Sequence, residues 1–274
     1  MTTLDETPLG KPVDYSDHYD PGLLCPISRE AGRADLGLTP GEALPFFGED
    51  VWNAYELSWL DNTGKPEIAM MEIRVPVDSP FLVESKSLKL YLSSFNMSRF
   101  SSGDRVASIV KKDLSLATGH AVTVTLVAPE QFSDVEIREP PGGCLDLTAP
   151  RLVGYTLDAQ GLKCADRVVS EAWFTRLFRS TCPVTGQPDW GTISIVYTGN
   201  KIDAAGLLGY LISFRQYAGF HENCVERIFM DITRRCRPEA LTVSARFTRR
   251  GGLDINPVRS IGPVVVDNIR DPRQ

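Results

Sequence analysis

The sequence predicts an α+β protein built from two similar halves. Read by the spacing of its apolar residues, each half gives strands, then two helices, then a strand. Two pairs of segments also match: TGKPEIAMMEIRV from Thr63 with TGQPDWGTISIVY from Thr185, and YLSSF from Tyr91 with YLISF from Tyr210. We therefore predict an internal duplication, with a leader over residues 1–45 that wraps the body, a first module over 46–135 and a second over 136–274.

In the first half, aromatic and apolar residues around Trp52–Trp59 predict a strand, and the alternation over Glu67–Val77 predicts a second one after a turn at 62–66. Glu84–Asn96, with the sequence ESKSLKLYLSSFN, predicts an amphipathic helix. Gly103–Gly119 predicts another helix that ends at the glycine, and Ala121–Ala128 predicts a strand. Pro80 should stop the strand before the first helix.

The predicted helix at Glu84 has two distinct faces. Leu88, Leu92 and Phe95 fall on one face, whereas three serines and two lysines fall on the other: Ser85, Lys86, Ser87, Lys89 and Ser93. A lysine in the first turn of a helix opposes the helix dipole. This cost is easier to understand if an anion such as a phosphate binds at the helix N-terminus. An ordinary amphipathic helix on a core is the simpler alternative.

The second half repeats this order after a connector at 129–150. Strands are predicted over 151–159, 172–179 and 191–197, helices over 206–217 and 221–235, and a strand over 241–248. When the halves are superimposed, Lys86 aligns with Ala205 and Cys182 aligns with Leu60. The polar helix face with Lys86 then occurs only in the first half, and the Cys182 thiol only in the second. A complete site is therefore expected where a surface of the first half meets a surface of the second.

The composition limits the possible functions. The chain has 274 residues, a net charge of −6 and a pI near 5.2, which argues against a general nucleic-acid-binding surface. It has no run of 18 apolar residues, so no membrane span is expected. Its acidic, polar N-terminus does not resemble a signal peptide. The six cysteines show no metal-ligand spacing, which favours free thiols in the cytoplasm and no bound metal.

Cys182 is the cysteine that could perform chemistry. It lies in the predicted loop STCPVTGQPDW, with Asp189 seven residues further on. Arg176, Arg179 or His221 could favour its thiolate, and Asp189 could donate a proton to a developing anion. The simpler interpretation is a small buried apolar side chain. We prefer that interpretation for Cys224, which can face the core of its helix beside Ile228.

Two further segments have open interpretations. Glu222 in a first helical turn is favoured by the helix dipole, but it could also accept N–H bonds from a planar heterocycle beside His221. Arg249-Arg250-Gly251-Gly252 is a solvated turn, or an arginine and glycine backbone that meet a phosphate.

Four of these segments together resemble one known family. ESKSLKLYLSSFN resembles the signature helix of the NADPH-dependent 7-cyano-7-deazaguanine reductases, the nitrile reductases of queuosine biosynthesis, a tRNA modification. STCPVTGQPDW resembles their catalytic segment, and FHENCVERI and FTRRGGLDINP resemble their substrate-binding and late cofactor-binding segments. The resemblance extends from about residue 20 to the end and fits the two-module form of the family. It implies two tandem tunnelling-fold (T-fold) modules, each an antiparallel sheet with helices on one face, in a homodimer.

The resemblance also implies a mechanism. Cys182 would add to the nitrile carbon and form a covalent thioimide, and Asp189 would protonate the nitrogen. Two NADPH molecules would reduce the adduct and the resulting imine to the amine. The substrate, a free base, would be held by Val83, Glu84, Ser85, His221 and Glu222. NADPH would contact Ser85, Lys86, Arg250 and Gly251, to which we add Lys89.

Two other functions remain open at the level of sequence. A cysteine hydrolase acting on a nitrile or an amide would use Cys182 with His221 and Glu222, and would need no NADPH. A non-catalytic T-fold protein would bind a purine or pterin without using the thiol. Composition and periodicity alone support only a soluble α+β protein with two similar halves.

Overall fold

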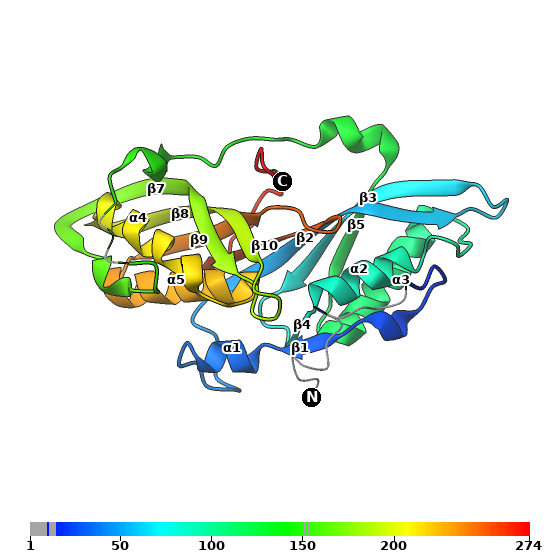
Figure 1. Cartoon of the computed structure of the whole chain (residues 1–274), viewed down its shortest axis with the longest axis horizontal. Coiled ribbons are helices and arrows are strands. Elements are labelled where there is room, and N and C mark those ends of the chain that lie inside the picture. The colour runs from blue at the N-terminus through cyan, green and yellow to red at the C-terminus, as the bar shows by residue number, and fades with distance from the viewer. Residues whose placement is uncertain (1–9, 11–14, 151, 153) are drawn as a thin grey trace. The chain divides into compact units, whose positions relative to one another are not determined.

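The computed structural model describes residues 10, 15–150, 152 and 154–274. The chain divides into two compact units, each assembled from three stretches of sequence (Figure 1). The first unit contains Met1–Ala31, Glu49–Glu136 and Arg249–Ile255, and the second contains Gly32–Gly48, Ile137–Thr248 and Asn256–Gln274. Within the described ranges, no helix combines the length and the apolar character needed to cross a bilayer.

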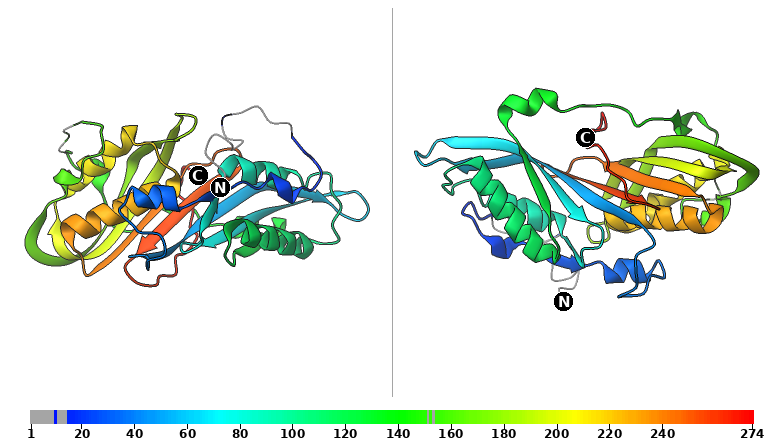
Figure 2. Two further views of the ribbon diagram at one scale, coloured as in Figure 1. Left: turned by 90° about the horizontal axis from the view of Figure 1, so that it is seen from below. Right: turned by 180° about the vertical axis from the view of Figure 1, so that it is seen from behind.

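The first unit is an antiparallel sheet with two helices on one face (Figures 1 and 2). The strands β2 (Phe47–Leu60), β3 (Pro66–Pro76) and β5 (Thr123–Val127) lie in the order β5-β3-β2, followed by the start of β10 (Leu253–Ser260). The helices α2 (Ser85–Ser93) and α3 (Gly103–Thr118) bury their apolar sides against β2 and β3. The core therefore lies between the helices and the sheet, as the amphipathic pattern predicts.

A second, smaller sheet precedes α2. The strand β1 (Pro26–Ser28) pairs antiparallel with β4 (Phe81–Val83), and the short helix α1 (Glu30–Ala34) follows β1. The strand β4 was not predicted. It begins directly after Pro80, and its three residues are too few to show a period.

The second unit repeats this architecture. Its sheet has the order β10-β9-β8-β7-β6, formed by β6 (Gly143–Cys144), β7 (Cys164–Thr181), β8 (Pro188–Ile202), β9 (Ala240–Phe247) and β10. The helices α4 (Ala204–Ile212) and α5 (His221–Cys236) cover one face of that sheet (Figure 1). Short 3₁₀ helices lie at 21–23, 129–134, 145–147, 159–161 and 213–216. In this sheet, β9 pairs antiparallel with β10, β8 with β9 and β7 with β8, whereas β6 pairs parallel with β7.

Matching irregularities in the two units support the predicted duplication. The β2–β3 pair has a bulge between Ala54 and Leu57, and the β7–β8 pair has one between Thr175 and Phe178. A tyrosine on the first helix donates to an aspartate on the second in both units: Tyr91 to Asp113 at 2.7 Å, and Tyr210 to Asp231 at 2.9 Å. Neither bulges nor buried hydroxyl–carboxylate bonds are required by the fold class, so their repetition indicates a common origin of the units.

The repeat also includes the segment before each first strand. Asp20 caps a 3₁₀ turn, and its N–H donates to Ser94 Oγ. Asp158 caps the equivalent turn, and its N–H donates to Ser213 Oγ. The N–H of the residue before α2, Glu84, is then bonded to Cys25 O, in the way that Asp203 before α4 is bonded to Lys163 O. The segment around residues 20–25 is thus an integral part of the repeated unit.

Three sequence-based assignments need correction. A strand was predicted over 151–159. Residues 151 and 153 lie outside the described residues, and the described remainder contains no strand, because Asp158 caps a turn there. The helix predicted over 206–217 ends at Ile212 and continues as a 3₁₀ turn. The strand β10 was missed because all eight of its residues are buried, including Asp254, Asn256 and Arg259, so it shows no alternation.

The alignment of Cys182 with Leu60 also needs correction. The N–H groups of Leu60 and Thr181 bond to equivalent carbonyls, Ser98 O and Tyr217 O. The residues after them, Asp61 and Cys182, each accept from a glycine N–H at the hairpin tip. The thiol therefore takes the place of an aspartate in the first unit. The second hairpin loop has one extra residue, which explains the shift.

Candidate active site

Cys182 lies at the end of the β7–β8 hairpin in the second unit. Its N–H donates to Gln187 O at 2.8 Å, which extends the pairing beyond the last strand residue, and only 4% of the residue is exposed. Ser180 faces Asp189 in the register of the hairpin. Because side chains alternate along a strand, Cys182 and Asp189 point to the same face as diagonal neighbours. The register of the hairpin therefore puts the thiol and the carboxyl group on the same face of the sheet.

The first turn of α5 brings an imidazole to this carboxyl group. His221 Nε2 lies 3.8 Å from Asp189 Oδ1, and both side chains are largely buried. The imidazole packs edge-on against Phe247, with ring centroids 4.0 Å apart. Glu222, the next residue, is 2% exposed and occupies the first turn of the helix, where the dipole favours a carboxylate. The structure thus brings together Asp189 and His221, two of the residues that the sequence analysis selected.

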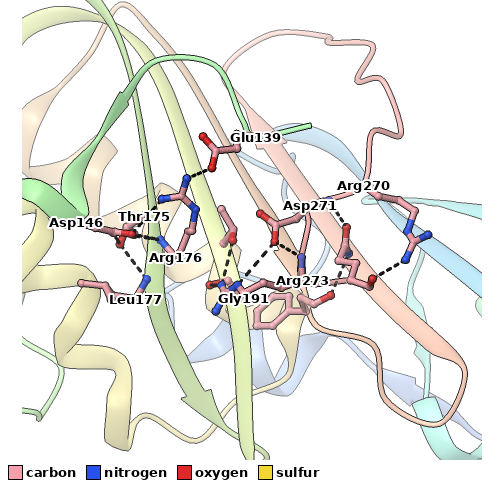
Figure 3. A network of polar contacts seen from close by, with 12 residues as sticks. Glu139, Asp146, Thr175, Arg176, Leu177, Gly191, Arg270, Asp271 and Arg273 are labelled. Atoms are coloured by element: carbon pink, nitrogen blue, oxygen red, sulfur yellow. Dashed lines mark hydrogen bonds and ion pairs between the residues drawn. The ribbon is translucent and has the colours of Figure 1, made fainter. Parts of the chain in front are cut away.

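The arginines considered as activators of Cys182 have other partners. Arg176 pairs with Glu139 and also approaches Asp146 at 3.5 Å (Figure 3). Arg179 lies 5.8 Å from the ring centroid of Trp190. Of the three candidates, His221 is the one that the structure places next to the carboxyl group of Asp189.

Cys224 is fully buried on α5, next to Ile228 in the core, which confirms the simpler interpretation. Burial raises the pKa of its thiol from 9.0 to about 12, and the nearby charges of Asp189 and Glu222 act in the same direction. Since only the thiolate is nucleophilic, this cysteine is inert at neutral pH.

This pKa gives a first prediction. In the native protein at about pH 8, a pKa near 12 leaves roughly 10⁻⁴ of the Cys224 thiol ionised. Alkylation by iodoacetamide, followed by mass spectrometry of peptides, should therefore label the exposed Cys164 long before Cys224. The two thiols should react at similar rates after unfolding in urea. Equal labelling in the native state would contradict the burial of Cys224.

The second group of candidate residues lies in the first unit, around the start of α2. Glu84 is 1% exposed, and its carboxylate accepts from Lys86 N at 2.6 Å and Ser87 N at 2.8 Å. Burial raises the pKa of Glu84, while these N–H bonds oppose the shift. The anion that we expected at this helix start is therefore Glu84 itself, which corrects the phosphate interpretation of the N-terminal N–H groups.

The segment before β2 holds this helix start in place. β1 pairs Pro26 with Val83, and Cys25 N donates to Ser87 Oγ at 3.0 Å. Ser87 is therefore buried, which corrects its placement on the polar face. Ser85, Lys86 and Lys89 are partly exposed, and Leu88, Leu92 and Phe95 are buried, as predicted.

The turn at Arg250–Leu253 brings a glycine against α2. Gly251 and Gly252 have φ angles of 58° and 78°, the two consecutive left-handed residues of a type I′ turn, closed by Leu253 N to Arg250 O at 3.1 Å. A Cβ on Gly251 would lie 3.0 Å from Lys89 Nζ. Arg249 stacks over Tyr55 at 4.8 Å. The ammonium group of Lys89 and the bare backbone of Gly251 therefore lie next to each other, an arrangement that suits a phosphate-bearing ligand.

None of the described residues form a group of three or more metal-ligating side chains. The second unit thus holds the Cys182 thiol, the carboxyl groups of Asp189 and Glu222 and the imidazole of His221, and the first unit holds Lys89 beside Gly251. These residue types are the ones expected in a thiol-dependent enzyme with an anionic ligand.

Comparison with known proteins agrees with this class. Residues 15–126 match the family described as "Nitrile reductase, 7-cyano-7-deazaguanine-reductase N-term", and residues 188–263 match a family described as "QueF-like protein". A protein from Desulfotalea psychrophila is 52% identical over 269 residues, covering 97% of both chains. One from Azoarcus sp. is 52% identical over 256 residues, covering 93% of this chain and 91% of the relative. A third, from Paraburkholderia phymatum, is 50% identical and covers 99% and 100%.

All three relatives carry the name NADPH-dependent 7-cyano-7-deazaguanine reductase. The chain belongs to this family of nitrile reductases. Among solved structures, an apo archaeosine synthase QueF-Like is similar with a TM-score of 0.32 and 16% identity, covering 37% of this chain and 99% of that one. Cys182 lies between the two matched ranges, and Asp189, His221 and Glu222 lie within the second.

Proposed function

We propose that this protein reduces the nitrile of 7-cyano-7-deazaguanine to the aminomethyl group with two NADPH, in queuosine biosynthesis, and that Cys182 forms a covalent thioimide with the substrate. Family membership supports the overall reaction. The observation that carries the site is the hairpin that places Cys182 and Asp189 on one face, with His221 Nε2 3.8 Å from the carboxyl group.

The residues of the second unit perform the covalent step. Cys182 Sγ forms a bond to the nitrile carbon and loses its proton, the nitrile nitrogen receives a proton from Asp189, and the thiol proton replaces it on the carboxylate, so that thiol plus nitrile give a thioimide with no atom lost. His221 orients Asp189 and can return its proton. Glu222, at the start of the same helix, is placed to accept N–H bonds from the deazaguanine ring.

The residues of the first unit hold the two ligands. Val83, Glu84 and Ser85 form the fixed start of α2, and Glu84 adds a second buried carboxylate for the heterocycle. Ser85, Lys86, Lys89, Arg250 and Gly251 fit NADPH, because the left-handed Gly251 leaves its backbone bare beside Lys89. When bound, NADPH supplies hydride, once for each of two reduction steps.

Asp189→Asn should slow thioimide formation by about 10²- to 10⁴-fold, because the amide keeps the shape of the side chain but lacks the proton to donate. The rate can be followed by stopped-flow absorbance of the adduct. Glu67→Gln is a matched control, because Glu67 occupies the equivalent position on β3 and is partly exposed. An Asp189→Asn protein that forms the adduct at the wild-type rate would exclude Asp189 as the acid.

The overall reaction is tested by mixing the protein with 7-cyano-7-deazaguanine without NADPH. We expect a new near-ultraviolet band and a matching mass increase on Cys182, followed by oxidation of two NADPH per nitrile once the cofactor is added. An adduct that decays to an acid and ammonia without NADPH would indicate a hydrolase. Tight reversible binding without an adduct would indicate a binding protein.

We further propose that the protein acts as a cytoplasmic homodimer on a free base, without binding nucleic acid or membrane. The net charge of −6 supports the absence of a nucleic-acid surface. Light scattering coupled to gel filtration would measure the oligomeric state, and a monomeric mass would contradict it.

A further inference from the structure

The segment Arg270–Gln274 forms a compact, internally hydrogen-bonded turn against the sheet of the second unit. Asp271 is 3% exposed, and its Oδ1 accepts from Arg273 N at 3.0 Å. Its own N–H donates to Gln274 Oε1 at 2.9 Å, and Arg270 Nη2 donates to Gln274 O at 2.5 Å. These bonds fix the segment internally, so that two of its side chains, Arg273 and Gln274, are presented in defined directions.

Arg273 contacts the strand that carries Asp189. Its Nη2 donates to Gly191 O and to Thr192 Oγ1, both at 3.1 Å (Figure 3). Gly191 follows Asp189 by two positions on β8, and the pairing of Gly191 with Phe247 is the first of the β8–β9 ladder. Asp189 lies two residues before this first pair. It is paired with Ser180 of β7, and Trp190 O, between Asp189 and Gly191, accepts from Thr248 N at 2.8 Å.

Gln274 contacts the strand that supports His221. Its Nε2 donates to Phe247 O at 3.0 Å and to Asn256 Oδ1 at 2.7 Å. The β9–β10 ladder pairs only residues 242–244 with 258–260, so Phe247 lies outside it. The side-chain amide of Gln274 donates to Phe247 O at a position where β10 is not paired with β9. Phe247 is also the residue whose ring packs on the imidazole of His221.

We propose that Arg273 and Gln274 are positioning residues that hold Asp189 and His221 in register with Cys182. This inference rests on the proposed function. Arg273 secures β8 beside Asp189, and Gln274 secures β9 beside the ring that supports His221. The bonds to Gly191 O and Phe247 O are made at the first pair of the β8–β9 ladder, so they help to set the relative position of the carboxyl group and the imidazole. A displacement of about 1 Å between reacting groups can slow a reaction by about 100-fold.

The test compares Arg273→Ala/Gln274→Ala with Arg246→Ala. Arg246 is a matched control, because it precedes Phe247 on β9 and donates two bonds to the same terminal stretch, to Asn268 Oδ1 at 2.7 Å and Asp267 O at 2.8 Å. The double variant should form the thioimide about 10-fold more slowly or worse, whereas the control stays within about twofold of wild type. Arg273→Lys, which retains a donor, should recover part of the rate.

A second readout is independent of the reaction. The imidazole protons of His221 should have a ring-current shift from Phe247, assigned by its loss in His221→Gln. That shift should move in the double variant and stay in the control. If the wild-type protein forms no adduct, the proposed function fails while the resonance still tests the positioning. Equal slowing in both proteins, or an unchanged rate and resonance in the double variant, would overturn the inference.

Discussion

Cys182→Ala should lower turnover by roughly 10⁴-fold or more, because removing the nucleophile of a covalent mechanism removes the reaction path itself. No near-ultraviolet band and no mass increase should appear with 7-cyano-7-deazaguanine. The fold should be kept, since the change removes one buried sulfur atom and leaves the hairpin bond from residue 182 N to Gln187 O in place. NADPH consumption and intact-protein mass measure both effects.

The same variant separates binding from chemistry. Calorimetry should still detect reversible binding of the nitrile substrate, because Glu84 and Glu222 are unchanged. Cys164→Ala is the control for a general effect of losing a thiol, since Cys164 is exposed at the start of β7. Cys164→Ala should be fully active. A Cys182→Ala protein that turns over would rule out the covalent mechanism.

Local patterns were sufficient to predict the elements that carry the site. The spacing of Leu88, Leu92 and Phe95 predicted α2, and the turn residues between Cys182 and Asp189 predicted a loop, which forms the tip of the β7–β8 hairpin. The register of that hairpin, which the sequence analysis did not predict, puts both side chains on one face. These are short-range relationships, set by backbone geometry that the nearby sequence determines.

Relationships between distant residues could not be predicted in this way. Asp254 accepts hydrogen bonds from Asn53 and Tyr55, about 200 positions away in sequence. Because these partners are distant, the polar residues of β10 gave no local indication that it is a buried strand. The support of Phe247 by Gln274 also depends on where two ladders end, which no local pattern records. Glu84 could have been recognised as an N-cap, because an acid before a helix commonly accepts its first N–H groups.

The largest stability effect should come from Glu226→Gln, at a buried charge network in the second unit. Glu226 Oε1 accepts from Arg259 Nη2 and from Arg33 Nη2, both at 2.9 Å, and Arg259 is completely buried. Both guanidinium groups also lie over Phe46, at 5.8 and 5.7 Å from its centroid. Removal of the carboxylate charge leaves two arginines without their shared counter-charge. We expect a loss of about 3–5 kcal/mol in unfolding free energy.

A double-mutant cycle distinguishes this cause from simple loss of packing. The cycle compares Glu226→Leu, Arg259→Met and the double variant Glu226→Leu/Arg259→Met. The double variant removes the charges of Glu226 and Arg259 together and keeps apolar volume, so it should be more stable than either single variant. Glu67→Gln removes one partner of the exposed Lys65–Glu67 pair and should cost at most about 1 kcal/mol. Urea unfolding followed by circular dichroism measures every variant. Additive losses in the cycle would mean that burial of Arg259 does not depend on Glu226, and that residues 33–46 are held to α5 by apolar contacts such as Phe46 with Phe229.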